Sequence, residues 1–106
     1  MNLRLICYAL ILLSLSACAV NAAERNTTGG NLYDQGLFDE ALRAYQMAQV
    51  TAPDAPEPYF NGAITFAQIG ELEEALAALN QALKTADDDL KAKAYYNLGN
   101  IYFEMS

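Results

Sequence analysis

One phrase of this sequence occurs twice at a fixed distance. GLFDEALRAYQMA begins at Gly36, and GELEEALAALNQA begins 34 residues later at Gly70. A partial third copy, AYYNLGNIYFEM, begins at Ala94. A period of this length indicates a helix–turn–helix unit that recurs along the chain. One such unit cannot bury its apolar face, whereas stacked units share a continuous core, so the repetition predicts an all-α solenoid.

The residues within each copy have the spacing of a helix. Between Asp39 and Val50, apolar and small residues recur every three or four positions, and charged residues occupy the opposite side. The alanines of this stretch let two helices approach closely. Gly36 and Gly70 stand at the predicted turns, where the C-terminal cap of a helix needs a positive φ.

Other residues predict where the helices begin. Asp54 is a candidate N-cap before Pro56, since proline is favoured in a first helical turn. Asp87 is a candidate N-cap for the next helix, in an acidic run that suits a helix N-terminus. Gly29 and Gly30 together cost a helix roughly 2 kcal/mol relative to alanine. We therefore expect residues 18–30 to comprise a tether and the start of the first helix, with NTTGG partly tether and the regular helix beginning near Asn31.

The repeated positions resemble the tetratricopeptide repeat pattern, which combines large, Leu-Gly and aromatic positions in a first helix with Ala, aromatic and Ala positions in a second. The resemblance covers residues 22–106, as repeats 22–55 and 56–91 and a partial repeat 92–106. It implies a right-handed α-solenoid of about two and a half repeats. The implied packing residues are Gly29, Leu32, Ala41, Tyr45, Ala48, Tyr59, Ala63, Phe66, Ala75, Leu79, Ala82, Tyr95, Leu98, Gly99 and Tyr102.

The N-terminus has the features of an export signal. Arg4 precedes an apolar run from Leu5 to Leu15, which is too short to span a bilayer and matches a secretory signal. The Leu15–Cys18 stretch resembles the lipobox of bacterial lipoproteins, which implies removal of residues 1–17 and acylation of Cys18. Ala19 after the cysteine favours the outer membrane by the same resemblance. Ordinary cleavage near Ala22 or Ala23, giving a soluble periplasmic protein, is the alternative.

The composition excludes several functions. The chain has a formal net charge of −7 and no histidine. The acidic balance disfavours nucleic-acid binding, and Lys84, Lys91 and Lys93 are too few for a basic patch. The absence of histidine removes the commonest general base and the commonest metal ligand. We therefore predict no enzyme activity, no cofactor and no metal; Asp87–Asp89 lacks the spaced oxygen ligands of a calcium loop.

In the tetratricopeptide family the first helices of the repeats line a concave groove that binds a protein or peptide. Asparagines beside aromatic rings suit an extended peptide, because amides pair with its backbone and rings cover its apolar side chains. Some members clamp a C-terminal carboxylate. Asn61 and Lys93 match two of those positions, but Asn26, Gly30 and Asn97 depart from the pattern, so we do not predict that activity. The predicted groove residues are Tyr33, Phe60, Asn61, Ile64, Lys93, Tyr96, Asn97 and Asn100.

Two functions from different classes remain open. The first is a non-catalytic interaction module at the bacterial envelope, held by a lipid anchor at Cys18. Envelope-assembly lipoproteins combine such an anchor with such an array, and ALKTADDDLKAKAYYNLGN also resembles repeats of aerotolerance-operon (Bat-type) proteins. The alternative is the N-terminal structural or oligomerisation part of a longer protein whose activity lies downstream.

The last predicted helix has an apolar face that no later helix of the sequence covers. We expect exposure of Tyr96, Ile101, Phe103 and Met105. Terminal repeats normally present a polar outer face, and this helix does not. The chain is therefore expected to continue the array beyond residue 106 or to pair there with another molecule. The oligomeric state and the partner stay open at this point.

Overall fold

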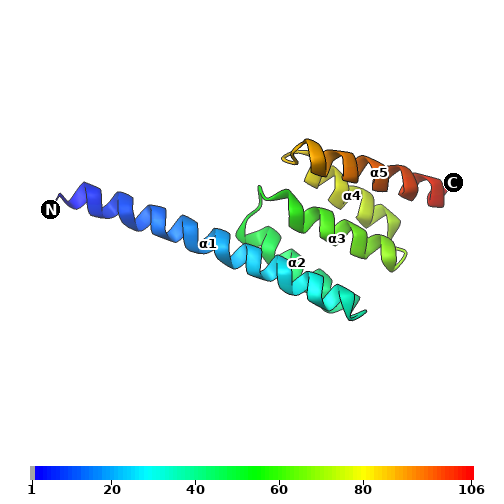
Figure 1. Ribbon diagram of the computed structural model, residues 1–106, viewed down its shortest axis with the longest axis horizontal. Coiled ribbons are helices and arrows are strands. Elements are labelled where there is room, and N and C mark those ends of the chain that lie inside the picture. The colour runs from blue at the N-terminus through cyan, green and yellow to red at the C-terminus, as the bar shows by residue number, and fades with distance from the viewer. Residues whose placement is uncertain (1) are drawn as a thin grey trace.

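The computed structural model of the protein describes residues 2–106, apart from the side chains of residues 15–19, and is all-helical over that range. Consecutive helices form antiparallel hairpins that stack side by side (Figure 1). This arrangement is the predicted α-solenoid. The helices are α1 (Leu3–Asp34), α2 (Phe38–Thr51), α3 (Pro56–Gln68), α4 (Leu72–Leu83) and α5 (Asp88–Met105).

The helices form two layers of unequal spacing. The first helix of each unit contacts the next one, α1 with α3 and α3 with α5. The second helices, α2 and α4, make no such contact anywhere in the described chain. Because the layer of first helices is closer together than the layer of second helices, the stack curves, and α1, α3 and α5 line its concave side.

Both hairpin turns have the same hydrogen bonds, as expected of a repeat. Gly36 has φ +77° and Gly70 has φ +83°, so both occupy the left-handed region that favours glycine. The next residue in each turn donates its N–H back to the helix, Leu37 to the Leu32 carbonyl and Glu71 to the Phe66 carbonyl, both at 2.9 Å. This is the Schellman arrangement, and it confirms the predicted glycine turns.

The predicted helix caps have mixed outcomes. Asp87 caps α5 as predicted, with its carboxylate accepting from the Leu90 N–H at 2.9 Å. The prediction for Asp54 is wrong, because the N-cap of α3 is Ala55 and no side chain accepts a hydrogen bond there. Pro56 at the first helical position, with φ fixed by its ring, starts α3 without a side-chain cap.

Small residues hold the helices together. Ala41, Ala48, Ala63 and Ala75 are fully buried, as is the much larger Leu79. Ala63, Ala75 and Leu79 form one cluster with Ala94 and Ile101, which links α3 and α4 to α5. The alanines allow backbones to approach closely, and the few large side chains fill the space between them.

The first helix does not begin near Asn31, and the NTTGG stretch is helical rather than a tether. The backbone is helical from Leu3 to Asp34, through both glycines. Gly29 is buried against the ring of Tyr45, and a Cβ added there would lie 2.5 Å from the ring atom Cε1. Packing of Tyr45 thus offsets the poor helix propensity of glycine. The sequence prediction considered that propensity without the packing.

Three predicted packing residues do not pack in this structure. Tyr95, Gly99 and Tyr102 are exposed, and nothing lies within 4 Å of a Cβ placed on Gly99. Their counterparts in α3 are Tyr59, Ala63 and Phe66. Ala63 and Phe66 pack in the cluster that α3 shares with α4, whereas α5 has no following helix in the described chain. The prediction that Ile101 is uncovered is also wrong, because Ile101 reaches the buried cluster of α3 and α4.

The N-terminal part of α1 projects from the helical body as an arm (Figure 1). Its apolar side chains are exposed, among them Leu5, Leu10 and Leu12. Among the residues whose placement is described, no helix combines the length and the apolar character needed to cross a bilayer. The predicted lipidation residue Cys18 lies among the side chains that the structure does not describe.

We expect Gly29→Ala to destabilise the protein and Gly30→Ala to leave it unchanged or more stable. The added methyl group of Gly29→Ala collides with the Tyr45 ring, whereas that of Gly30→Ala lies 3.8 Å from the Tyr45 hydroxyl oxygen. Overpacking of this kind costs about 1–3 kcal/mol, and alanine gains about 1 kcal/mol over glycine within a helix. Urea unfolding followed by circular dichroism measures both. Equal midpoints for the two variants would contradict the packing of Tyr45 on Gly29.

The free energy of unfolding is expected to fall above about pH 10, because the phenol of Tyr45 ionises more readily in the unfolded state. Burial, and then the charge of Asp34 and the phenol of Tyr33, raise the pKa of Tyr45 above its ordinary value. Below the unfolded pKa both states keep the proton and stability is complete; as pH rises toward the folded pKa, the unfolded state releases it first and stability is lost. Urea midpoints of the wild type and Tyr45→Phe, compared across this range, should converge or cross as pH rises. A difference that stays constant with pH would refute the assignment.

Candidate functional site

An amide pair joins the first two helices of the concave face. Asn61 on α3 donates from Nδ2 to Oδ1 of Asn26 on α1, at 3.0 Å. Both side chains are half-buried, so the bond lies at the floor of the concave side and still reaches solvent. The sequence argument placed both residues on this face, and the structure brings them together. The bond uses one N–H and one lone pair, so the pair retains further donors and acceptors for a ligand.

A buried threonine fixes the carbonyl of the same asparagine. The hydroxyl of Thr65, which is fully buried, donates to the Asn61 carbonyl oxygen at 2.8 Å, one helical turn earlier in α3. A threonine within a helix commonly makes this bond to the preceding turn. Sequence reasoning did not single out Thr65; its polar side chain on the apolar face of α3 was the available signal.

A second inter-helix bond, also missed, sets α3 against α2. The side-chain amide of Gln49 donates from Nε2 to the Pro58 carbonyl oxygen at 3.2 Å. That carbonyl lies in the first turn of α3, close to the residues of the concave face. A single glutamine in a helix gives no distinctive sequence signal, so only the packed structure identifies this contact.

A hollow of about 320 Å³ lies beside the amide pair, where α1 meets the start of α3. Its walls combine small apolar residues with polar groups from the concave face. The N-terminal turn of α3 contributes Glu57 and Pro58, and the α2–α3 connection contributes Ala52 and Ala55. Its lining residues are Ala22, Ala23, Asn26, Thr27, Ala52, Ala55, Glu57 and Pro58.

The apolar groove residues mainly contact other side chains of the protein. Tyr33 packs edge-on against Phe38 across the first hairpin, with ring centroids 5.2 Å apart and an interplanar angle of 63°. Phe60 is half-buried against the shared core cluster. Ile64, one turn beyond Phe60 on α3, is half-buried as well. Each therefore offers only part of its surface to a ligand.

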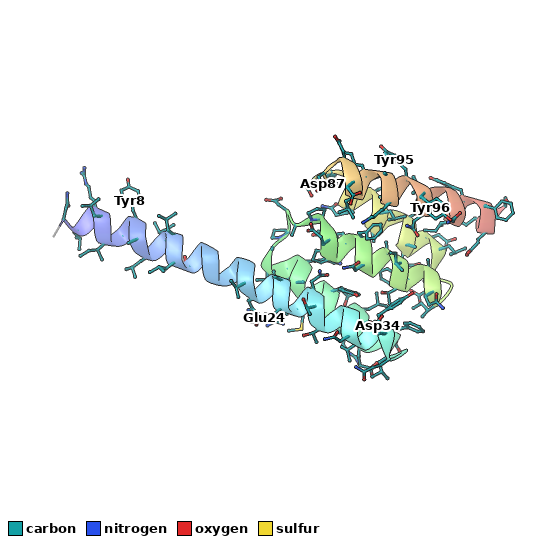
Figure 2. All side chains as sticks on the ribbon, in the orientation of Figure 1. Tyr8, Glu24, Asp34, Asp87, Tyr95 and Tyr96 are labelled. Carbon is teal, nitrogen blue, oxygen red and sulfur yellow. The ribbon has the colours of Figure 1, made fainter. Side chains whose placement is uncertain are left out.

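The groove residues of α5 are more accessible. Tyr96 is 71 % exposed, and Asn100, one turn later, is exposed as well. Lys93 lies 3.2 Å from the Asp89 carboxylate. Asn97 donates its side-chain N–H to the Lys93 carbonyl at 2.8 Å, within the same helix. Figure 2 shows Tyr96 on α5 and Asp34 at the far end of α1, so the candidate face spans the width of the stack.

The electrostatics of this face do not suit an anion. Lys93 is paired with Asp89 within α5, and the two side-chain contacts described between helices, Asn61 to Asn26 and Gln49 to the Pro58 carbonyl, are neutral. Within the part of the chain that the structure describes, no cluster of His, Cys, Asp or Glu side chains could hold a metal ion. The arrangement is suited to hydrogen bonding with an uncharged backbone and to contact with apolar side chains.

Comparison with known proteins agrees with this architecture. The sequence profile of the family described as tetratricopeptide repeat matches residues 27–91 and, in an overlapping match, residues 60–104. Together these matches cover well over half of the chain.

Among solved structures, the chain is similar to the second tetratricopeptide repeat domain of Spaghetti (RPAP3), solved with the HSP90 peptide SRMEEVD bound. The TM-score is 0.76 at 20 % sequence identity, and the match covers 82 % of this chain and 79 % of the other. At this identity the likeness establishes the fold alone. With the family match and the repeated hairpins taken together, this chain belongs to the tetratricopeptide repeat family.

Proposed function

We propose that the protein is a non-catalytic interaction module that holds an extended segment of a partner protein on its concave face. The observation that carries this proposal is the amide pair of Asn26 and Asn61, which joins α1 to α3 and retains hydrogen-bonding capacity. An extended segment presents free N–H and C=O groups at regular spacing, and amide side chains can satisfy both kinds. Tyr96 and the partly exposed Phe60 would cover its apolar side chains.

The net charge of the chain restricts the class of partner segment that the concave face can bind. The similar domain of Spaghetti was solved with a peptide that ends in Glu-Glu-Val-Asp. In this chain the net charge is −7, and Lys93 is already beside Asp89. An acidic segment would meet repulsion here, so the proposed ligand is a neutral or basic segment with apolar side chains. Nucleic acid is disfavoured for the same reason.

We further propose that Cys18 carries a lipid anchor and that the module works at the periplasmic face of the bacterial envelope, most naturally at the outer membrane. The burial of Ala22 supports cleavage before Cys18 over cleavage near Ala22 or Ala23. Ala22 is only 4 % exposed and shares the hollow beside α3 with Ala52 and Ala55. Cleavage before Cys18 retains this packed residue, whereas cleavage after Ala22 or Ala23 removes it.

An anchor at Cys18 would hold the array close to the membrane. Cys18 lies four positions before the buried Ala22, a span of roughly 6 Å as helix and at most about 14 Å when extended. The concave face would thus act on partners near the bilayer surface. Three acyl chains would make the attachment firm, because each buried CH₂ contributes about 0.8 kcal/mol.

Site-specific photocrosslinking in cells tests the binding face. A benzophenone amino acid at Asn100, on the exposed concave part of α5, should give adducts with a partner protein; the same probe at Asn80 on α4 is the matched control. Asn61→Ala should reduce the Asn100 adducts about tenfold, as expected for losing one to two hydrogen bonds. Circular dichroism must show that Asn61→Ala stays folded. Adducts of equal yield at both probe positions, or adducts indifferent to Asn61→Ala, would place binding elsewhere.

Metabolic labelling tests the anchor. Cells supplied with radiolabelled palmitate should label the wild type and Cys7→Ser, because Cys7 lies within the predicted signal. Cys18→Ser should lose the label completely and accumulate at a higher mass. Label retained by Cys18→Ser, or absent from the wild type, would rule out lipidation at Cys18 and leave the peptide-binding proposal untouched.

A further inference from the structure

The hollow beside the amide pair, where α1 meets the start of α3, has an apolar lining with three polar side chains. Four alanines and Pro58 supply the apolar lining, and the polar groups come from Asn26, Thr27 and Glu57. Figure 1 shows the short connection from α2 to α3 next to the middle of α1, and residues of both line the hollow. Its volume of about 320 Å³ is close to the lower limit for ligand pockets, so it suits one side chain better than a whole peptide.

The charge of the hollow is negative. Among the residues that the structure describes, Glu57 is the one charged side chain that lines it, and an adjoining hollow that shares Thr27 adds Glu24. Both ion pairs of the described chain lie elsewhere, so Glu57 has no cationic partner there. Arg25 on α1 lines a separate hollow with Arg43 on α2. A cationic ligand would therefore meet an unpaired carboxylate.

The first turn of α3, which borders the hollow, is not suited to an anion. A helix N-terminus normally attracts anions through its free backbone N–H groups. Pro56 and Pro58 have no N–H, and Glu57 between them carries a negative charge. This combination removes donors and adds a carboxylate at the same place, so the complementary ligand group is a cation.

The neutral polar groups of the hollow can accept further hydrogen bonds. Thr27 donates its hydroxyl hydrogen to the Ala23 carbonyl at 3.0 Å, so its oxygen keeps lone pairs for a ligand donor. Oδ1 of Asn26 accepts one bond, from Asn61, and has a second lone pair. With Glu57, three side chains thus offer acceptors. A lysine ammonium brings three donors and no acceptor, whereas the planar fork of arginine matches a single carboxylate.

We propose that the hollow is a specificity subsite that takes one lysine side chain of the partner segment. The methylene stem of the lysine lies on the alanines and Pro58, and its ammonium pairs with Glu57, as an amphipathic side chain places its stem on apolar surface and its charge at a polar group. Asn26 belongs both to the hollow and to the amide pair, so the backbone of the segment can lie on the amides while the lysine enters the hollow. This inference rests on the proposed function, because the lysine belongs to the segment bound there.

A nuclear magnetic resonance titration of the full chain in dodecyl maltoside tests the hollow directly. The probe is N-acetyl-lysine methylamide, and the control probe is N-acetyl-norleucine methylamide, which has the same stem without the ammonium. The lysine probe should shift the backbone amide signals of Thr27 and Glu57 with a dissociation constant on the order of 1 mM, as expected for a ligand of about fourteen non-hydrogen atoms. The norleucine probe should bind about fivefold more weakly, which is the upper range for an exposed ion pair.

Two charge variants locate the effect. Glu57→Gln should abolish the preference for the lysine probe. Asp54→Asn removes the same charge from an exposed position that does not line the hollow, and it should keep the preference. Equal binding of both probes to the wild type, a comparison that needs no variant, would overturn the inference. A lysine preference that survives Glu57→Gln, or that is lost equally with Asp54→Asn, would do the same.

The photocrosslinking experiment separates this inference from the proposed function. Glu57→Gln should lower the yield of Asn100 adducts about fivefold, and Asp54→Asn should leave it unchanged. Adducts that depend on Asn61 but are indifferent to Glu57→Gln would refute the lysine subsite and retain the proposed function. Adducts missing from the wild type altogether would contradict the proposed function itself.

Discussion

Close approach of helices at glycine and alanine positions is the constraint on which this structure depends. Ala41 and Ala48 in α2, and Ala63 and Ala75 in the second hairpin, are fully buried, so each pair of helices nests with little side chain between the backbones. Where a large residue enters such a contact, the opposite position must be empty. The ring of Tyr45 over Gly29 is the clearest case. Gly99 in α5 shows the opposite case, because nothing lies within 4 Å of the position that its Cβ would occupy.

Curvature of the stack follows from this packing and creates the candidate binding face. The first helices α1, α3 and α5 touch in succession, whereas α2 and α4 do not touch. The closer layer becomes the concave side, and it is there that Asn26 and Asn61 meet. The amide pair is thus a consequence of helix spacing as much as of residue choice. Thr65, buried beneath it, ties the backbone of Asn61 to the core side of α3.

The two exposed surfaces of α5 have different chemistry. Toward the concave side it carries Lys93, Asn97 and Asn100, polar groups that suit an extended segment. Its other exposed residues include Tyr95, Gly99 and Tyr102, two aromatic rings with a glycine between them.

The sequence by itself determined the class of fold, because a 34-residue period with helical spacing is a local property that every copy repeats. It also determined the glycine turns and the Asp87 cap, which depend on neighbours within one turn of chain. It could not determine that α1 continues through Gly29 and Gly30, since that depends on Tyr45 from another helix. Nor could it show that Tyr95 and Tyr102 are exposed while Ile101 is buried. Contacts between elements decide those points, and only tertiary structure supplies the neighbours whose packing outweighs local propensity.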